Sequence, residues 1–209
     1  MSRYLNDFAN RSRSEDICRR ALLRRTASLL CVSTAAVVLG PGVRFAFAAP
    51  SQNDWAHCIY CNMLFFNGYP QNKGRCAAYG VPSKSPHVGK KGDFTKYQVT
   101  YDDSTGPGQG DWRYCRKCGV LFFNGYAEKG VCAADHGGHE AAGYNFFLYH
   151  DRQKHQDEED GWRYCAKCHA LFYAAAAPTP PSTFDCPADG KLHAAAGYRF
   201  VVGRKLPTL

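Results

Sequence analysis

The sequence has little methionine and no long apolar run. It holds two methionines among 209 residues, which gives little support to a helical core or to an adaptable methionine-rich surface. No segment beyond residue 50 repeats its apolar residues with a period of 3.6, so no amphipathic helix is predicted there. An apolar run of about fifteen residues that ends at Gly40 is shorter than the roughly 20 residues of a membrane-spanning helix. These absences argue against a helical bundle and against an integral membrane protein.

Common catalytic motifs are also missing. The sequence contains no Gly-x-Ser-x-Gly, no His-Glu-x-x-His and no phosphate-binding loop. The acidic run at residues 157–160 is predicted to be a solvated linker and not a pair of catalytic carboxylates. The sequence therefore favours a protein that is not an enzyme.

The positive charge is concentrated at one end of the chain. The formal net charge is +8, and residues 1–48 hold eight arginines but only three acidic residues. The rest of the chain has 18 basic and 15 acidic residues. Because this part is only weakly basic, no nucleic-acid partner is predicted.

Residues 1–48 are predicted to be a cleaved signal peptide. Arg24 and Arg25 precede the weak apolar run, and Ala46 and Ala48 supply small residues at positions −3 and −1 of a peptidase site. The pattern is typical of a twin-arginine (Tat) signal, with an ordinary Sec signal as the alternative. Tat exports folded proteins, so cysteines can bind metal before they meet an oxidising compartment. We expect a periplasmic or secreted protein with no membrane anchor after cleavage.

Beyond this signal the sequence repeats itself three times. The pattern Trp-x-x-Cys-x-x-Cys-x-x-Leu-Phe begins at Trp55, Trp112 and Trp162, so the repeat is about fifty residues long. The predicted units are residues 1–48 (signal peptide), 49–54 (linker), 55–103 (repeat 1), 104–111 (linker), 112–151 (repeat 2), 152–161 (linker) and 162–209 (repeat 3).

Each repeat is predicted to contain four short strands. In repeat 2 these are residues 112–114, residues 120–123, a segment around Cys132 and residues 144–149, which are rich in aromatic residues. Asn124-Gly125 is expected to form a hairpin turn, since both residues tolerate positive φ. The expected fold is all-β, with three zinc-stapled repeats closed around a pseudo-threefold axis as in a β-trefoil, because closure hides strand edges. Three zinc-ribbon-like beads in a row are the alternative.

The cysteines and histidines follow the repeat. Nine cysteines lie beyond the signal, three per repeat, and an odd number cannot pair within one repeat. Three thiolates and one imidazole complete the tetrahedral shell of a structural zinc ion. Disulfides within each Cys-x-x-Cys, with the remaining thiols paired between repeats, are the alternative. The three predicted zinc sites are Cys58, Cys61, Cys76 and His87; Cys115, Cys118, Cys132 and His139; and Cys165, Cys168, Cys186 and His193.

Two other histidines compete for these roles. His136 also follows Cys132, but Gly190 stands at the equivalent position of repeat 3, so His139 is preferred. Cys165 to His169 match the attachment motif of c-type haem, but Asn62 and Gly119 replace this histidine in the other repeats. Haem attachment is therefore disfavoured.

A ligand-binding patch is predicted after the second cysteine of repeats 1 and 2. Both contain Phe-Phe-Asn-Gly-Tyr, in which the first phenylalanine is expected in the core. The candidate ligand-binding residues are Asn67, Tyr69, Asn124 and Tyr126. Exposed tyrosines of this kind stack on sugar rings or contact proteins.

The Cys118-Gly119 turn resembles the knuckle of zinc ribbons. Residues 55–202 resemble a group of uncharacterised secreted bacterial proteins with tandem Trp-x-x-Cys-x-x-Cys-x-x-Leu-Phe repeats, a resemblance that implies no particular activity. The sequence predicts a monomeric, non-catalytic binding module with three structural zinc ions that recognises a glycan or protein outside the cytoplasm. The alternatives are a secreted zinc-dependent hydrolase, in which His87 leaves its ion to admit water, and a reservoir of zinc or thiols.

Overall fold

The computed structural model describes residues 49–78, 86–89, 96–102, 105–175 and 185–205. These residues form nine β-strands and no α-helix, so the predicted all-β class is confirmed. Within the same ranges there is no helix with the length and apolarity to cross a membrane. The strands are β1 (Ser51–His57), β2 (Leu64–Phe66), β3 (Lys96–Tyr101), β4 (Gly108–Cys115), β5 (Leu121–Phe123), β6 (Ala141–His150), β7 (Glu158–Cys165), β8 (Leu171–Tyr173) and β9 (Ala195–Lys205).

Each repeat has three strands in its described part, not the four that were predicted. The segment around Cys132 is a turn: its N–H donates to the carbonyl of Gly137 at 2.7 Å, and its carbonyl accepts from the N–H of His136 at 2.8 Å. Because these local hydrogen bonds use the backbone groups that a strand would offer to a neighbour, no strand forms there.

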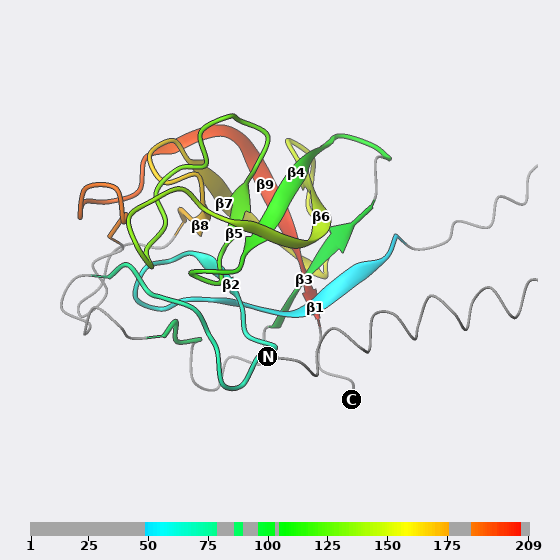
Figure 1. Cartoon of the computed structure of the whole chain (residues 1–209). Helices are drawn as coiled ribbons and strands as arrows, with labels where there is room; N and C mark the ends of the chain where they lie inside the picture. Colours follow the sequence, from blue (N-terminus) through cyan, green and yellow to red (C-terminus); the bar gives the residue numbers. More distant parts are fainter. Residues whose placement is uncertain (1–48, 79–85, 90–95, 103–104, 176–184, 206–209) are drawn as a thin grey trace, which may run out of the picture. The chain divides into compact units, whose positions relative to one another are not determined.

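Within a repeat, the first strand pairs with both of the others (Figure 1). β4 pairs with β5 and β6, and β7 pairs with β8 and β9, always antiparallel. The register of each first strand shifts just before its tryptophan. The residue before the tryptophan has positive φ in all three repeats, at Asp54 (70°), Asp111 (61°) and Gly161 (91°). One bulge is thus built three times, and it turns the tryptophan towards the core.

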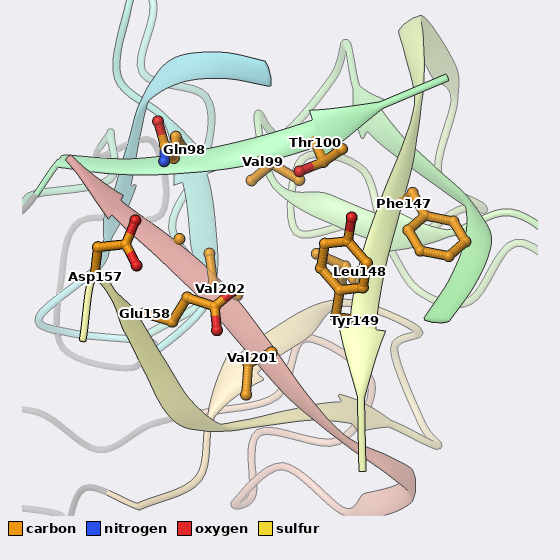
Figure 2. A pocket seen from close by; sticks show the side chains of 11 residues that line it. Gln98, Val99, Thr100, Phe147, Leu148, Tyr149, Asp157, Glu158, Val201 and Val202 are labelled. Carbon is orange, nitrogen blue, oxygen red and sulfur yellow. The ribbon is translucent and has the colours of Figure 1, made fainter. Parts of the chain in front are cut away.

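The last strands of the three repeats pair with one another in a ring. Thr100 pairs with Phe147, Tyr149 with Val201, and Gly203 with Gln98, at equivalent positions of β3, β6 and β9. Figure 2 shows these strands crossing as the sides of a triangle around a cavity of about 70 Å³. All nine strands therefore belong to one sheet. Shared strand pairing favours a closed arrangement of the repeats over three independent beads.

The short second strands divide the core into two layers, because successive side chains of a strand point to opposite faces. Leu64, Leu121 and Leu171 pack with the three tryptophans, which are 0% exposed. The phenylalanines that follow them, Phe65, Phe122 and Phe172, pack instead with the nine cysteines. One layer thus holds the tryptophans and the other holds the candidate metal ligands.

The predicted linkers contribute to the sheet. β1, β4 and β7 all begin inside segments that were predicted as linkers. In the acidic run, Glu158 pairs with Arg152 at 2.5 Å and Glu159 accepts a hydrogen bond from the hydroxyl of Tyr97 in repeat 1. Glu158 and Glu159 thus lie in β7 and are half-buried, so this part of the run is not a solvated linker, whereas Asp157 and Asp160 are exposed.

The Asn-Gly pairs do not form the predicted hairpin turns. Neither Asn124 nor Gly125 has positive φ, and the hairpin between β4 and β5 is closed by the Cys-x-x-Cys segment on the other side of β5. Gly125 is needed for space: a Cβ there would lie 2.4 Å from the ring of Phe123, and one at Gly68 would lie 2.5 Å from Phe66. The glycine lets the phenylalanine ring fold over the backbone.

Candidate metal centres

Each candidate centre is assembled from one hairpin and one loop. In repeat 2, Cys115 ends β4, Cys118 lies in the turn to β5, and Cys132 and His139 come from the loop that leads to β6. The same construction places all twelve predicted residues in three groups of four, whose candidate ligand atoms lie within 4.8 Å of one another in each group. The groups are Cys58, Cys61, Cys76 and His87; Cys115, Cys118, Cys132 and His139; and Cys165, Cys168, Cys186 and His193. Eleven of these residues are buried and His193 is half-buried.

A tight turn brings the first two sulfur atoms of each group together. The N–H of Cys115 donates to the carbonyl of Val120 at 2.9 Å, and the N–H of Gly119 donates back to the carbonyl of Cys115 at 2.8 Å. Gly119 has a φ of 83°, and Asn62 and His169 take the same left-handed conformation in the other repeats (60° and 65°). The turn therefore needs a residue that tolerates positive φ, which glycine and asparagine do most readily.

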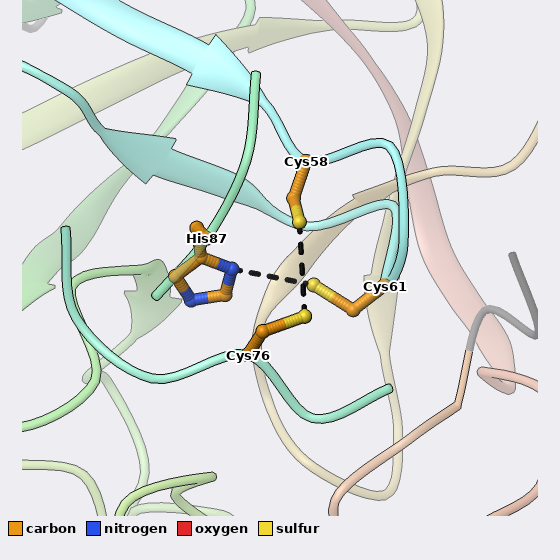
Figure 3. Close-up of side chains that lie close together, drawn as sticks. All are labelled: Cys58, Cys61, Cys76 and His87. Atoms are coloured by element: carbon orange, nitrogen blue, oxygen red, sulfur yellow. Dashed lines mark hydrogen bonds between the residues drawn. The ribbon is translucent and has the colours of Figure 1, made fainter. Parts of the chain in front are cut away.

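The distances between ligand atoms match a tetrahedral zinc shell. The sulfur atoms of the first and third cysteine are 3.8 Å apart in repeats 1 and 3 and 3.9 Å apart in repeat 2. The sulfur of the second cysteine lies 3.4, 3.4 and 3.5 Å from the histidine Nδ1 in repeats 1 to 3. Zn–S bonds of about 2.3 Å and Zn–N bonds of about 2.0 Å would give tetrahedral edges of roughly 3.8 and 3.5 Å. Figure 3 shows the four side chains of repeat 1 converging on one point.

The same distances do not fit disulfides. All nine described cysteines, including both members of each Cys-x-x-Cys pair, are free. The sulfur atoms of Cys58 and Cys76 are 3.8 Å apart, which is also nearly twice the disulfide bond length of about 2.05 Å. The geometry thus favours metal ligation over the disulfide alternative.

The thiols of one group influence one another strongly. In repeat 2, hydrogen bonds from Cys118 and Cys132 lower the pKa of Cys115, whereas burial raises the pKa of Cys118 well above its usual value. The hydrogen bond to Cys115 raises the pKa of Cys132 to about 11. A metal ion binds the deprotonated thiolates, so metal affinity of such a group depends on pH.

Each histidine links its own centre to the next repeat. While Nδ1 faces the sulfur atoms, the Nε2–H of His87 donates to the carbonyl of Cys118 at 3.0 Å. His139 donates to Cys168 at 2.9 Å, and His193 donates to Cys61 at 3.1 Å, which closes the ring. Such an outer hydrogen bond selects the tautomer that presents Nδ1 to a metal and orients the imidazole.

Phenylalanine rings hold the histidines from the side. Phe65 stacks on His87 with ring centroids 4.9 Å apart, Phe122 on His139 at 4.6 Å, and Phe172 on His193 at 4.7 Å. This contact explains why the second residue of each Leu-Phe pair recurs in the sequence.

Backbone from a neighbouring repeat also touches the centres. The N–H of Arg75 donates to the carbonyl of Cys118 at 3.0 Å. Gly74, with a φ of 71°, packs so closely here that a Cβ would lie 1.8 Å from this oxygen, and Gly130 makes the same approach to Cys168. The loop of each of these repeats therefore rests on the cysteine turn of the next.

The competing histidines lie outside the three groups. His136 is exposed and its Nδ1 lies 3.2 Å from the carbonyl oxygen of Pro187. His169 occupies the left-handed position after Cys168 and contacts the rings of Tyr126 and Tyr164. The choice of His139 over His136 thus agrees with the geometry.

The predicted ligand-binding residues separate into two kinds. Tyr69 and Tyr126 are each 52% exposed. Asn67 and Asn124 are half-buried, and their N–H groups donate to the carbonyls of Asp54 and Asp111 at 2.8 Å. The asparagines support the bulges before the tryptophans, and only the tyrosines project outward.

The residues that surround Tyr126 were not predicted from the sequence. A cavity of about 280 Å³ at the junction of repeats 2 and 3 is lined by Gln109, Phe123, Tyr126, Tyr164, Gly197, Tyr198 and Phe200. A tyrosine stands directly before the first cysteine in repeats 2 and 3. Its recurrence was a signal for these residues, but only the fold brings β9 beside this loop.

Comparison with known proteins adds no further assignment, because no family model, curated protein or solved structure matches the chain.

Proposed function

We propose that the protein is a non-catalytic binding module whose three repeats are each stabilised by one structural zinc ion. The spacing of the ligand atoms in the three Cys₃His groups carries the proposal. Three thiolates and an imidazole in a tetrahedron are typical of zinc, whereas magnesium and calcium prefer oxygen ligands.

Four protein ligands leave a zinc ion no open position for water or substrate. The hydrolase alternative requires one ligand to leave, with His87 as the candidate. His87 is 0% exposed, donates to Cys118 and stacks on Phe65, as its counterparts do in the other repeats. The hydrogen bond and the ring contact recur in all three centres and support a structural role for each histidine.

The proposal includes a closed, pseudo-threefold architecture of the β-trefoil type. Its support is the ring of equivalent pairings among β3, β6 and β9 and the ring of histidine hydrogen bonds. A unit of about fifty residues buries too little surface to be stable alone. Metal ligation and closure supply the missing stability together.

We place the protein in the periplasm or outside the cell. The predicted signal peptide, residues 1–48, lies outside the described residues, so this location rests on the sequence. Nine reduced cysteines are compatible with an oxidising compartment if zinc occupies them before export, as the Tat route allows.

The partner is proposed to be a glycan or a protein outside the cytoplasm. Support comes from the exposed Tyr69 and Tyr126, which stand at equivalent positions of repeats 1 and 2. The zinc-reservoir alternative requires rapid exchange of the ions. Ligands that are almost all buried argue against that exchange.

Elemental analysis of the mature protein tests the metal proposal directly. We expect three zinc ions per chain, slow exchange with a coloured chelator, and unfolding once the zinc is removed. A protein that contains no metal and has all nine thiols oxidised would overturn the proposal. Fast exchange with an intact fold would favour the reservoir instead.

A further inference from the structure

The cavity at the junction of repeats 2 and 3 has the lining of a small-ligand site. Four strands and one loop contribute to it: Gln109 comes from β4, Phe123 from β5, Tyr164 from β7 and Tyr198 from β9, while Tyr126 follows β5. Its volume of about 280 Å³ lies near the lower end of ligand pockets, at roughly 300 Å³. A site of this size admits one small group, such as a single ring of a longer chain.

Rings behind the exposed tyrosines hold them in place. Tyr198 is 44% exposed and stacks on His150, with ring centroids 3.7 Å apart and planes inclined by 8°. The edge of Tyr126 packs on Phe123 at 5.0 Å and on Tyr164 at 6.3 Å. Because the rings are already ordered, a ligand that stacks on them loses little additional entropy.

The polar groups of the cavity are neutral. Its described lining contains no Asp, Glu, Lys or Arg, and its polar side chains are the phenols and the amide of Gln109. A charged ligand would lose hydration here without gaining a counter-charge. A neutral sugar instead offers C–H groups to the rings and hydroxyls to the phenols and the amide.

Repeats 1 and 2 carry the same set of residues at their junction. Gln52, Phe66, Tyr69, Tyr114, Tyr144 and Phe146 stand at the positions of Gln109, Phe123, Tyr126, Tyr164, Tyr198 and Phe200. Here Tyr144 is 45% exposed and stacks on Tyr101 at 4.0 Å and 12°. The rings of Tyr69 and Tyr114 are 6.4 Å apart, which matches their counterparts. At the third junction His57 stands at the position of Tyr114 and Tyr164 and packs against Trp162 and Tyr173.

We propose that this cavity and the equivalent aromatic cluster at the junction of repeats 1 and 2 bind a neutral polysaccharide, one sugar ring at each, so that the polymer is held at two points. This inference rests on the proposed binding function and specifies its ligand. Two weak sites on one rigid scaffold can exceed the affinity of either by about 10²- to 10⁴-fold, provided that one polymer reaches both.

Affinity electrophoresis of the zinc-loaded mature protein tests the inference. The gels contain hydroxyethyl cellulose, glucomannan or dextran, and insoluble chitin is tested by co-sedimentation. We expect retention by at least one of these polymers. Tyr126→Ala should weaken it at least tenfold, and the double variant Tyr69→Ala, Tyr126→Ala should abolish it. Leu192→Ala, which shortens a 56% exposed side chain outside both proposed binding sites, should bind like the unmodified protein.

Zinc content and the indole N–H signals of the tryptophans establish that each variant is folded. No retention by any polymer, or full retention of the folded double variant, would overturn the sugar inference. Capture of an envelope protein without any polysaccharide would also overturn it, yet would leave the proposed binding function standing. A protein that lacks zinc would instead refute the proposed zinc-stabilised module, whatever it binds.

Discussion

Replacing Cys132 with serine should destabilise all three repeats and not only repeat 2. Cys132 is 0% exposed and belongs to the central Cys₃His group. A structural zinc site contributes about 10–16 kcal/mol of binding free energy, so with equal shares the loss of one of four ligands costs roughly 2.5–4 kcal/mol. For a domain of this size the corresponding fall in Tm is about 10 °C. Since whole domains are stable by only about 5–15 kcal/mol, the effect should be easy to measure.

The structure gives two routes by which this change reaches the other repeats. His139 donates to the carbonyl of Cys168 in repeat 3, and the carbonyl of Cys118 accepts hydrogen bonds from His87 and Arg75 in repeat 1. When the central ion is lost, both the donor and the acceptor lose their fixed positions. We therefore expect all three repeats to unfold together, with the same reduced free energy of unfolding reported by each.

The tryptophans report on the repeats one by one. Trp55, Trp112 and Trp162 are each fully buried, one per repeat, so their indole N–H signals in nuclear magnetic resonance spectra follow each repeat separately during denaturation. Elemental analysis of the same samples should give fewer than three zinc ions per chain. The matched control is His136→Ala, since His136 lies in the same loop but is exposed and outside the metal group. It should keep three zinc ions and the original stability.

Coupling between the repeats would be refuted if the Cys132→Ser protein loses only the Trp112 signal while Trp55 and Trp162 keep their original denaturation midpoints. That result would mean that the repeats behave as independent beads in spite of their shared strands. Equal loss of zinc in the His136→Ala protein would refute the assignment of His139.

Two further predictions concern the loops and the pH. Gly74→Ala should prevent zinc uptake or folding, because its Cβ would lie 1.8 Å from the carbonyl oxygen of Cys118. Gly110→Ala is the control and should be tolerated, since nothing lies within 4 Å of the added Cβ. Normal zinc content and Tm in the Gly74→Ala protein would contradict this close approach. Acidification should release the zinc and then unfold the protein, because a bound ion lowers the pKa of its thiols below their unfolded value and this stabilisation is lost as the pH falls through the lowered pKa. A chelator-based release curve checks this, and loss of zinc on raising the pH instead would contradict it.

The Cys₃His groups could be predicted because comparison of the repeats excludes the competing histidines, His136 and His169. Repeats 2 and 3 share one spacing, from Cys132 to His139 and from Cys186 to His193, so His139 could be chosen over His136 without any structure. The all-β class followed from the alternating, aromatic segments before and after the cysteines. These signals are local, and local patterns can be read from a sequence.

The contacts between repeats could not be predicted in this way. Nothing in the sequence shows that Tyr149 pairs with Val201, or that a histidine binds the backbone of the following repeat, because backbone acceptors leave no trace in residue type. The Asn-Gly pairs were misread for a related reason. A glycine signals either positive φ or a lack of space, and only the fold distinguishes these at Gly125.

The ring of histidine hydrogen bonds has a consequence for the number of repeats in the closed arrangement. Each repeat offers one imidazole N–H and one cysteine carbonyl, and His193 completes the set by returning to Cys61. An assembly of two repeats would leave a donor and an acceptor unmatched at its open ends, and a fourth repeat would have no place in the triangle of last strands. The number of repeats is therefore a property of the closure geometry. A single repeat produced alone would have to recruit two further copies of itself, and the smallest complete form of this architecture would then be a trimer.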